Sequence, residues 1–157
     1  MTGSATKAKQ HALRLLGYRG RSERELRGRL AQKGFGDDII SDVVDDLKDA
    51  GLLNDQALAV HLRRYALENK RLGFEGARRF LLERGIDRAT ADSVVGFDEE
   101  SEVRTIRTLA ERRIKTGRGM NPSSSKKLWA FFVRRGFAPS SIRKALRTLQ
   151  QCEEADL

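Results

Sequence analysis

The sequence is poor in cysteine, proline and long apolar runs, and each shortage narrows what the protein can be. A single cysteine, Cys152, excludes a disulfide framework and is typical of a reducing cytoplasm. Two prolines in 157 residues favour long helices over turn-rich β-structure. No apolar run approaches the roughly 18 residues of a membrane span, and the N-terminus lacks a signal-peptide core. We therefore expect a cytoplasmic protein with no membrane partner.

Residues that carry catalysis or bind metals are also scarce. His11 and His61 are the two histidines, and no His, Cys or carboxylate spacing resembles a zinc site. Cys152 has no histidine near it in the sequence that would activate it as a nucleophile. The acidic run at 37–49 has carboxylates spaced for the solvated face of an amphipathic helix, not for a calcium loop. We predict no enzymatic activity, no metal site and no cofactor.

Positive charge is plentiful but unevenly distributed along the chain. The net charge is +9, of which residues 1–51 contribute +2 and residues 52–102 contribute −2. Residues 103–157 contain 13 Lys and Arg against four Asp and Glu, a net charge of +9. Such asymmetry predicts a polyanion or an acidic protein surface as the partner. The alternative is that these cations only solvate helix faces.

A helix-ending signal repeats three times. A cation, a glycine and a large apolar residue occur together at 33–35, 84–86 and 135–137, 51 residues apart. A glycine after the last helical turn adopts a left-handed conformation, and the next residue packs on the residue four before the glycine. The required apolar pairs are present at five glycines: Gly17, Gly34, Gly51, Gly85 and Gly136. The signal therefore ends a helix, and its cation suits the negative helix C-terminus.

Helix starts are marked as well. Ser22 with Glu25 forms the S-x-x-E capping-box pattern. Asp37 is a predicted N-cap. Pro122 and Pro139 suit positions in a first helical turn.

The apolar positions share the 51-residue period. Shifting the chain by 51 aligns buried helix faces in four sets: Leu26/Ala77/Leu128, Ile40/Ala91/Ile142, Val43/Val94/Ala145 and Val44/Val95/Leu146. The sequence predicts nine helices, at about 5–17, 22–34, 37–50, 54–70, 74–85, 87–96, 98–116, 122–136 and 139–151. We expect an all-α fold of three tandem three-helix repeats, elongated and able to curve. The predicted divisions are repeats at 1–51, 52–97 and 98–152, then an acidic tail at 153–157.

The clustered cations are the candidate binding residues. The first cluster, at the entry to the second predicted helix, comprises Arg19, Arg21, Arg24 and Arg27. The larger group lies on the last three predicted helices: Arg104, Arg107, Arg112, Arg113, Lys115, Lys126, Lys127, Arg134, Arg135, Arg143, Lys144 and Arg147. Arg143 and Arg147 are one helical turn apart with Lys144 beside them, which predicts one basic face. If several of these cations neutralise phosphates, binding weakens steeply with salt.

Three aromatic residues lie among these charges: Trp129, Phe131 and Phe132. Aromatic rings in such surroundings can stack on nucleic-acid bases. Core packing explains Phe131 and Phe132 better, because Phe132 is assigned to a helix-end contact and Phe131 matches Phe80 one period earlier. For Trp129 both interpretations stay open.

Three segments resemble the RecX family of bacterial modulators of the recombinase RecA: ALRLLGYRGRSERELRGRLAQKGF, GLLNDQALA and KRLGFEGARRFLLERGI. The resemblance covers roughly residues 10–150, and KLWAFFVRRGFAPSSIRKAL is similar to the family's final repeat. It implies three three-helix repeats, no catalysis, and binding along the groove of the RecA–DNA filament. Bound there, such proteins restrain ATPase, strand-exchange and repressor-cleavage-promoting activities. The implied partners are the RecA filament and the single- or double-stranded DNA within or beside it, and we predict a monomer.

The family has no motif of catalytic residues to transfer, so the site residues rest on charge clustering alone. The middle repeat is net acidic, which suggests that it faces protein and not DNA. Two other classes compete with this interpretation. One is a plain DNA-binding protein of tandem three-helix units, although Myb-like repeats use several tryptophans and this chain has only Trp129. The other is a protein-interaction scaffold, which would show little salt-dependent DNA affinity.

Overall fold

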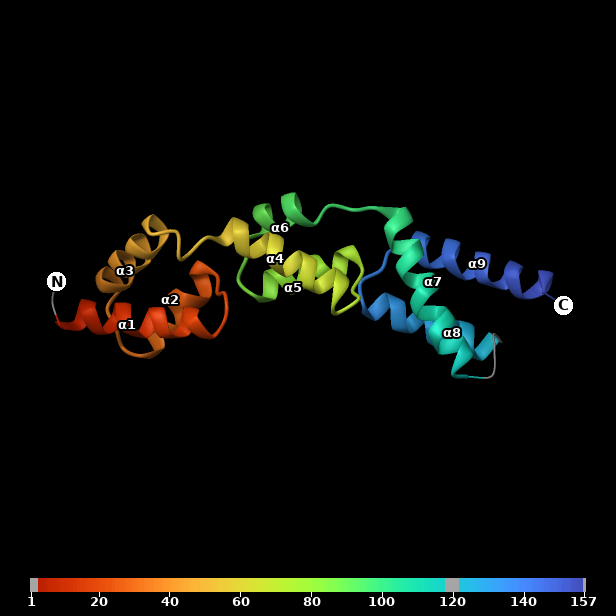
Figure 1. The fold of residues 1–157 in the computed structure, drawn as a ribbon, viewed down its shortest axis with the longest axis horizontal. Helices are drawn as coiled ribbons and strands as arrows, with labels where there is room; N and C mark the ends of the chain where they lie inside the picture. The colour runs from red at the N-terminus through yellow and green to blue at the C-terminus, as the bar shows by residue number, and fades with distance from the viewer. Residues whose placement is uncertain (1–2, 118–121, 157) are drawn as a thin grey trace. The chain divides into compact units, whose positions relative to one another are not determined.

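The computed structural model describes residues 3–117 and 122–156, and within these ranges it contains nine α-helices and no β-strand (Figure 1). The helices are α1 (Gly3–Tyr18), α2 (Glu23–Gln32), α3 (Asp37–Asp49), α4 (Asp55–Glu68), α5 (Phe74–Glu83), α6 (Arg88–Val95), α7 (Glu99–Lys115), α8 (Pro122–Arg134) and α9 (Pro139–Ala155). The predicted all-α class is confirmed. One boundary is wrong: α9 continues four residues past the predicted end at 151, so Glu153 and Glu154 are helical.

The predicted helix starts are mostly confirmed. Ser22 is the N-cap of α2, and its hydroxyl oxygen accepts a hydrogen bond from the Glu25 backbone N–H at 3.1 Å. Pro122 and Pro139 are the first residues of α8 and α9. The prediction for Asp37 is wrong by one position, because the N-cap of α3 is Gly36 and Asp37 already lies in the helix.

The glycine-ended helices behave as the repeat predicts at four of five sites. Gly34, Gly51, Gly85 and Gly136 all have positive φ, between +74° and +91°. At the last of them, the N–H of Phe137 donates to the Phe132 carbonyl at 3.1 Å, the backbone pattern of a Schellman ending. The prediction for Gly17 is wrong, since α1 continues through it to Tyr18. The pair Leu13 and Tyr18 is 41% and 77% exposed, so no apolar contact stabilises a turn there.

The chain divides into two compact units, and the division runs through α4 and α5. Unit 1 comprises residues 1–62 and 80–94, and unit 2 comprises residues 63–79 and 95–157. The helices α1, α2 and α3 enclose a core in unit 1: Ala8, Ala12, Leu26, Leu30, Ile40, Val43, Val44, Leu47 and Leu53. The helices α7, α8 and α9 enclose a core in unit 2: Ile106, Ala110, Leu128, Phe132, Phe137, Ile142, Ala145, Leu146 and Leu149. The repeat boundaries at 51/52 and 97/98 stay predictions.

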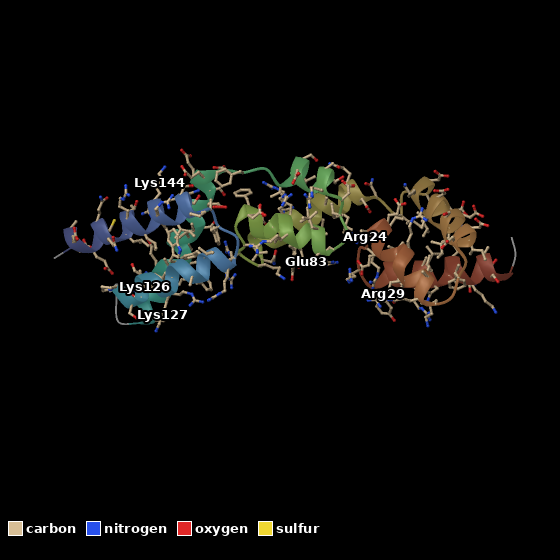
Figure 2. All side chains as sticks on the ribbon, turned by 180° about the vertical axis from the view of Figure 1, so that it is seen from behind. Arg24, Arg29, Glu83, Lys126, Lys127 and Lys144 are labelled. Carbon is tan, nitrogen blue, oxygen red and sulfur yellow. The ribbon has the colours of Figure 1, made fainter. Side chains whose placement is uncertain are left out.

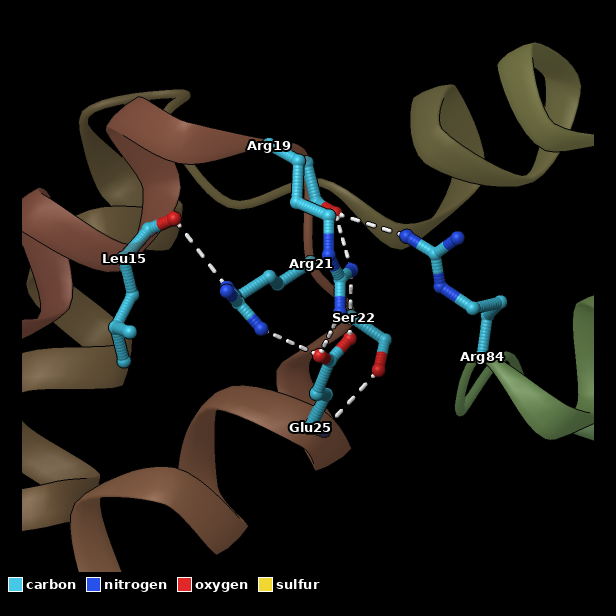
Figure 3. Close-up of polar contacts among 7 residues, drawn as sticks. Leu15, Arg19, Arg21, Ser22, Glu25 and Arg84 are labelled. Carbon is cyan, nitrogen blue, oxygen red and sulfur yellow. Dashed lines mark hydrogen bonds and ion pairs between the residues drawn. The ribbon is translucent and has the colours of Figure 1, made fainter.

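Two of the three cations of the repeated signal, Arg84 and Arg135, join their helix-ending turn to an earlier loop of the same unit. In unit 1, Arg84 donates to the Gly20 carbonyl oxygen at 3.4 Å (Figure 3). In unit 2, Arg135 donates to the Lys70 carbonyl oxygen at 2.7 Å. The two cations are 51 residues apart in the sequence and their acceptors are 50 apart, so the two contacts correspond closely. The cation therefore does more than face a helix C-terminus, because it also fixes the turn against the start of a preceding helix.

Glycine is required where the α8–α9 turn meets α5. The Gly73 N–H donates to the Arg135 carbonyl at 3.0 Å. A Cβ atom placed on Gly136 would lie 2.1 Å from the backbone nitrogen of Gly76, so no side chain fits at position 136. At the equivalent Gly85 in unit 1 the nearest atom belongs to a side chain and not to the backbone, since a Cβ atom there would meet the Ser22 hydroxyl at 2.3 Å.

A buried carboxylate completes this contact in unit 2. Glu102 on α7 is 2% exposed. Its carboxylate accepts hydrogen bonds from the backbone N–H groups of Phe74 at 3.1 Å and Ala138 at 2.9 Å. These two donors stand at the starts of α5 and α9, where helix N–H groups lack partners within the helix. One side chain thus ties α7, α5 and α9 together and fixes the position of α9.

Candidate nucleic-acid interface

The first predicted basic cluster is largely neutralised by its own carboxylates. Arg21 contacts Glu25 at 2.6 Å and donates to the Leu15 carbonyl at 3.2 Å (Figure 3). Arg19 contacts the same carboxylate, with one hydrogen bond of 3.2 Å. Arg27 is bound to Glu23 at 3.1 Å. Three of the four predicted residues therefore help to hold the α1–α2 connection and the first turns of α2 together, and their part in binding stays a prediction.

The electrostatics of the two glutamates agree with this interpretation. Burial raises the pKa of the Glu25 carboxyl, but hydrogen bonds and charge from Arg19 and Arg21 outweigh burial and hold the pKa below its ordinary value. The pKa of Glu23 is also lowered, because Lys48 and Arg27 outweigh the effect of its burial. Both carboxylates are therefore ionised at neutral pH and remain available to pair with the arginines.

Arg24, the fourth member, stands apart from these pairs. Together with Arg29, which the sequence did not single out, it lines an open groove of about 600 Å³ between α2 and the end of α5 (Figure 2). Neither arginine forms an ion pair with any residue that the structure describes. Glu25 and Glu83 line the same groove, so its charge is mixed. Arg29 escaped the sequence analysis because only cations at the entry to the helix were grouped.

Two predicted cations of the larger group lie against an aromatic ring. The guanidinium carbons of Arg113 and Arg135 are 3.8 Å and 4.5 Å from the ring centroid of Phe131. Phe131 packs on the core of unit 2 and meets Phe132 edge to face. Core packing is therefore confirmed for both phenylalanines, and Arg113 and Arg135 cover the outer side of that core.

Most other predicted cations of unit 2 are exposed. Nine of these ten cations form no ion pair with any residue that the structure describes. Six of the nine lie outside the groove described next, and of these six only Arg107 is partly buried: Arg104, Arg107, Arg112, Lys115, Lys127 and Arg134. Lys144 differs, since its amino group is 3.6 Å from a carboxylate oxygen of Glu99 on α7. The three residues predicted to form one face of α9 therefore have different surroundings. Lys144 pairs with Glu99, whereas Arg143 and Arg147 line a groove.

Arg143 and Arg147 line a groove of about 340 Å³ between α8 and α9, together with Lys126. Two apolar residues of the groove are Leu146, which is buried, and Trp129, which is partly buried and packs on the core of unit 2. No Asp or Glu is among the described residues that line the groove. Lys127 is adjacent to Lys126 on α8 (Figure 2) but does not line it. In this groove the structure brings three predicted cations and Trp129 together.

Neither a membrane-spanning helix nor a metal site is found in the described ranges. No helix within 3–117 or 122–156 combines the length and the apolar composition that spanning a bilayer requires. In the same ranges, no group of three or more His, Cys, Asp or Glu side chains is arranged to hold a metal ion.

Known proteins place the chain in a family. A family model described as "RecX, first three-helix domain" matches residues 8–47, which include most of α1, all of α2 and most of α3. The chain is 30% identical over 147 residues to the regulatory protein RecX of Caldanaerobacter subterraneus subsp. tengcongensis, covering 90% of this chain and 70% of the relative. The chain belongs to the RecX family. The regulatory protein RecX of Chlorobium phaeobacteroides is also 30% identical, over 89% of this chain and 91% of the relative.

Solved structures agree with the RecX fold. The crystal structure of RecX from Lactobacillus salivarius matches with a TM-score of 0.84, over 96% of this chain and 99% of the other. At 22% sequence identity, this likeness bears on the fold and not on individual side chains. The family resemblance noted from the sequence is therefore confirmed, and the chain is a RecX-family regulatory protein.

Proposed function

We propose that this chain regulates the recombinase RecA by binding the RecA–DNA filament and inhibiting its ATPase, strand-exchange and coprotease activities. It does so as a cytoplasmic monomer and without catalysing a reaction. The observation that carries the proposal is membership of the RecX family, whose resemblance implies modulation of RecA. Inhibition, filament binding and the monomeric state are part of the proposal.

The distribution of charge supports a protein that meets both protein and DNA. Unit 2 carries the exposed cations of α7, α8 and α9, which suit a phosphate backbone. In unit 1, α3 presents an acidic groove lined by Asp38, Asp42, Asp45 and Asp46. DNA would repel that surface, so it suits the protein part of a filament.

The test is the single-stranded-DNA-dependent ATPase of the cognate RecA, titrated with this protein in the presence of excess DNA. The excess removes simple competition for DNA as an explanation. We expect the ATPase rate to fall at protein concentrations below those of RecA, because a bound regulator acts on a filament of many subunits. An unchanged rate at saturating protein would refute the proposed function.

Direct DNA binding without RecA is the second candidate, and the groove between α8 and α9 favours it. Three cations and a tryptophan line that groove, and no carboxylate does. A plain DNA binder would inhibit the ATPase only while DNA is limiting, and excess DNA would relieve the inhibition. The same titration, repeated at two DNA concentrations, therefore separates the two candidates.

A further inference from the structure

We propose that the groove between α8 and α9 is a binding site for single-stranded nucleic acid, in which one base stacks on Trp129 while Lys126, Arg143 and Arg147 bind the flanking phosphates. This inference deepens the proposed function, because it names the part of unit 2 that contacts the DNA. It can stand or fall without RecA, since it concerns an affinity of the isolated chain.

The groove combines the two kinds of group that single-strand binding requires. Lys126, Arg143 and Arg147 are exposed, and none forms an ion pair with another residue in the described part of the chain. Trp129 and Leu146 are more buried, since Leu146 belongs to the core of unit 2 and Trp129 packs against that core. A cationic rim that follows the backbone and an aromatic ring that receives a base is the general arrangement of such sites.

Two other grooves carry charge, and each lacks part of this arrangement. The groove between α2 and the end of α5 has Arg24 and Arg29, but Glu25 and Glu83 also line it and no aromatic residue does. The groove between α1 and α3 is lined by four aspartates, which exclude a polyanion. Of these three grooves, only the one between α8 and α9 joins uncompensated cations to an aromatic ring.

Single-stranded nucleic acid fits the groove better than a duplex does. A base must leave its stack before it can lie on a tryptophan, and the bases of a duplex are stacked and paired. Stacking on a ring and contacts to phosphates accept any base, so we expect little sequence preference.

The support around Trp129 holds the ring in place for this contact. α8 and α9 are joined by the glycine turn at 136, and the Glu102 carboxylate fixes the start of α9. The ring packs on a core that includes Leu128 and Ile142. A ring fixed in this way loses little conformational freedom when a base binds.

The experiment uses the full chain and its own fluorescence, because Trp129 is its single tryptophan. We expect a thymidine oligonucleotide of about 15 residues to quench the emission saturably, as a stacked base does. An abasic oligomer of equal length, which has the phosphates but no bases, is expected to bind more weakly and leave the emission nearly unchanged. Equal quenching by both oligomers would refute stacking on Trp129.

Variants locate the phosphate contacts, with anisotropy of a labelled oligonucleotide as the readout. Arg143→Ala with Arg147→Ala is expected to weaken binding by about tenfold and to reduce the slope of log affinity against log salt by about 1.4, two single-strand phosphate contacts. Lys126→Ala is expected to weaken binding, whereas Lys127→Ala removes the same charge from α8 outside the groove and changes affinity little. Equal losses for the two lysine variants would place binding elsewhere.

Trp129→Leu keeps an apolar side chain on the core and removes the ring. We expect about tenfold weaker oligonucleotide binding with unchanged circular dichroism, the range known for loss of one stacked base. Wild-type protein that binds the labelled oligonucleotide without any change in Trp129 emission would overturn the site. Inhibition of RecA by a protein that shows no quenching would refute this site and leave the proposed function standing. Quenching of Trp129 emission without inhibition of RecA would support this site and refute the proposed function.

Discussion

Unit 1 and unit 2 both carry arginines close to helix ends, but these arginines contact different groups. In unit 1, Arg19 and Arg21 converge on Glu25, and Arg27 binds Glu23. In unit 2, Arg143 and Arg147 stand at a groove that no carboxylate lines. A cation paired with a nearby carboxylate helps to stabilise the fold, and a cation without such a neighbour remains available to a ligand.

The repeated turn is also packed differently at Gly34 and at Gly136. The turn at Gly34 in unit 1 has open space around the position of a Cβ atom, whereas the turn at Gly136 in unit 2 abuts the backbone of Gly76. The same three-residue signal therefore has two uses. At 33–35 it only ends a helix, and at 135–137 it also fixes one helix pair against another helix.

Replacing Gly34 or Gly136 with alanine is expected to give the largest difference in lost stability, because the two turns are packed differently. Gly34→Ala strains only the backbone, since φ is +91° and nothing lies within 4 Å, and should cost about 1 kcal/mol of stability. Gly136→Ala adds a collision at 2.1 Å and should cost about 3 to 5 kcal/mol. Thermal melting followed by circular dichroism measures both. Equal losses would mean that the two turns are packed alike.

Removal of a capping carboxylate is expected to give the next largest difference in lost stability between unit 2 and unit 1. Glu102→Ala leaves the N–H groups of Phe74 and Ala138 without their buried acceptor, and should cost about 3 kcal/mol. Asp55→Ala in unit 1 removes the acceptor of one N–H, that of Glu23, and should cost about half as much. Urea titration of both variants is the measurement. A smaller loss at Glu102 than at Asp55 would contradict the role given to the buried carboxylate.

The sequence predicted the helices, the glycine turns and most buried positions, because these depend on local periodicity. Leu26, Ala77 and Leu128 are all buried, as the 51-residue period requires, and Val94 alone among the four aligned sets is only partly buried. It could not predict the partners of Arg84 and Arg135, since each donates to a carbonyl about 65 residues away in the sequence. Contacts at that separation depend on how helices pack and leave no local pattern.

The sequence predicted only part of the candidate site, again because contacts between helices leave no local pattern. The basic composition of residues 103–157 pointed to α7, α8 and α9, but the groove depends on which faces of α8 and α9 meet. The ion pairs within the first cluster could have been predicted from the sequence. Glu23 lies four residues before Arg27 and Glu25 four after Arg21, a spacing at which opposite charges pair on a helix or at its start.

A charge-matched pair of double variants tests the comparison of the arginines directly. Arg143→Gln with Arg147→Gln should weaken single-stranded DNA binding by about tenfold and leave the melting temperature nearly unchanged. Arg19→Gln with Arg21→Gln removes the same charge, and should lower stability by about 1 kcal/mol while changing DNA affinity less than about twofold. Anisotropy of a labelled oligonucleotide measures the affinity of each double variant, and thermal melting measures its stability. A similar loss of affinity in both would show that overall charge, not position, governs binding.

Lowering the pH is expected to reduce the stability of unit 1 through protonation of Glu25, and this is the smallest of the predicted effects. Its pKa in the folded protein lies below the ordinary value of 4.5, because Arg19 and Arg21 outweigh the effect of burial. The unfolded chain therefore binds more protons between those two pKa values, and stability rises with pH across that window. The contribution is complete above about pH 5 and is lost as the pH falls through the lowered pKa. It amounts to less than about 1 kcal/mol, since the pairs are partly exposed and screened by solvent. Urea midpoints between about pH 3 and 7 should fall less steeply in acid for Glu25→Gln than for the wild type, whereas identical pH profiles would show that Arg19 and Arg21 do not stabilise the ionised carboxylate.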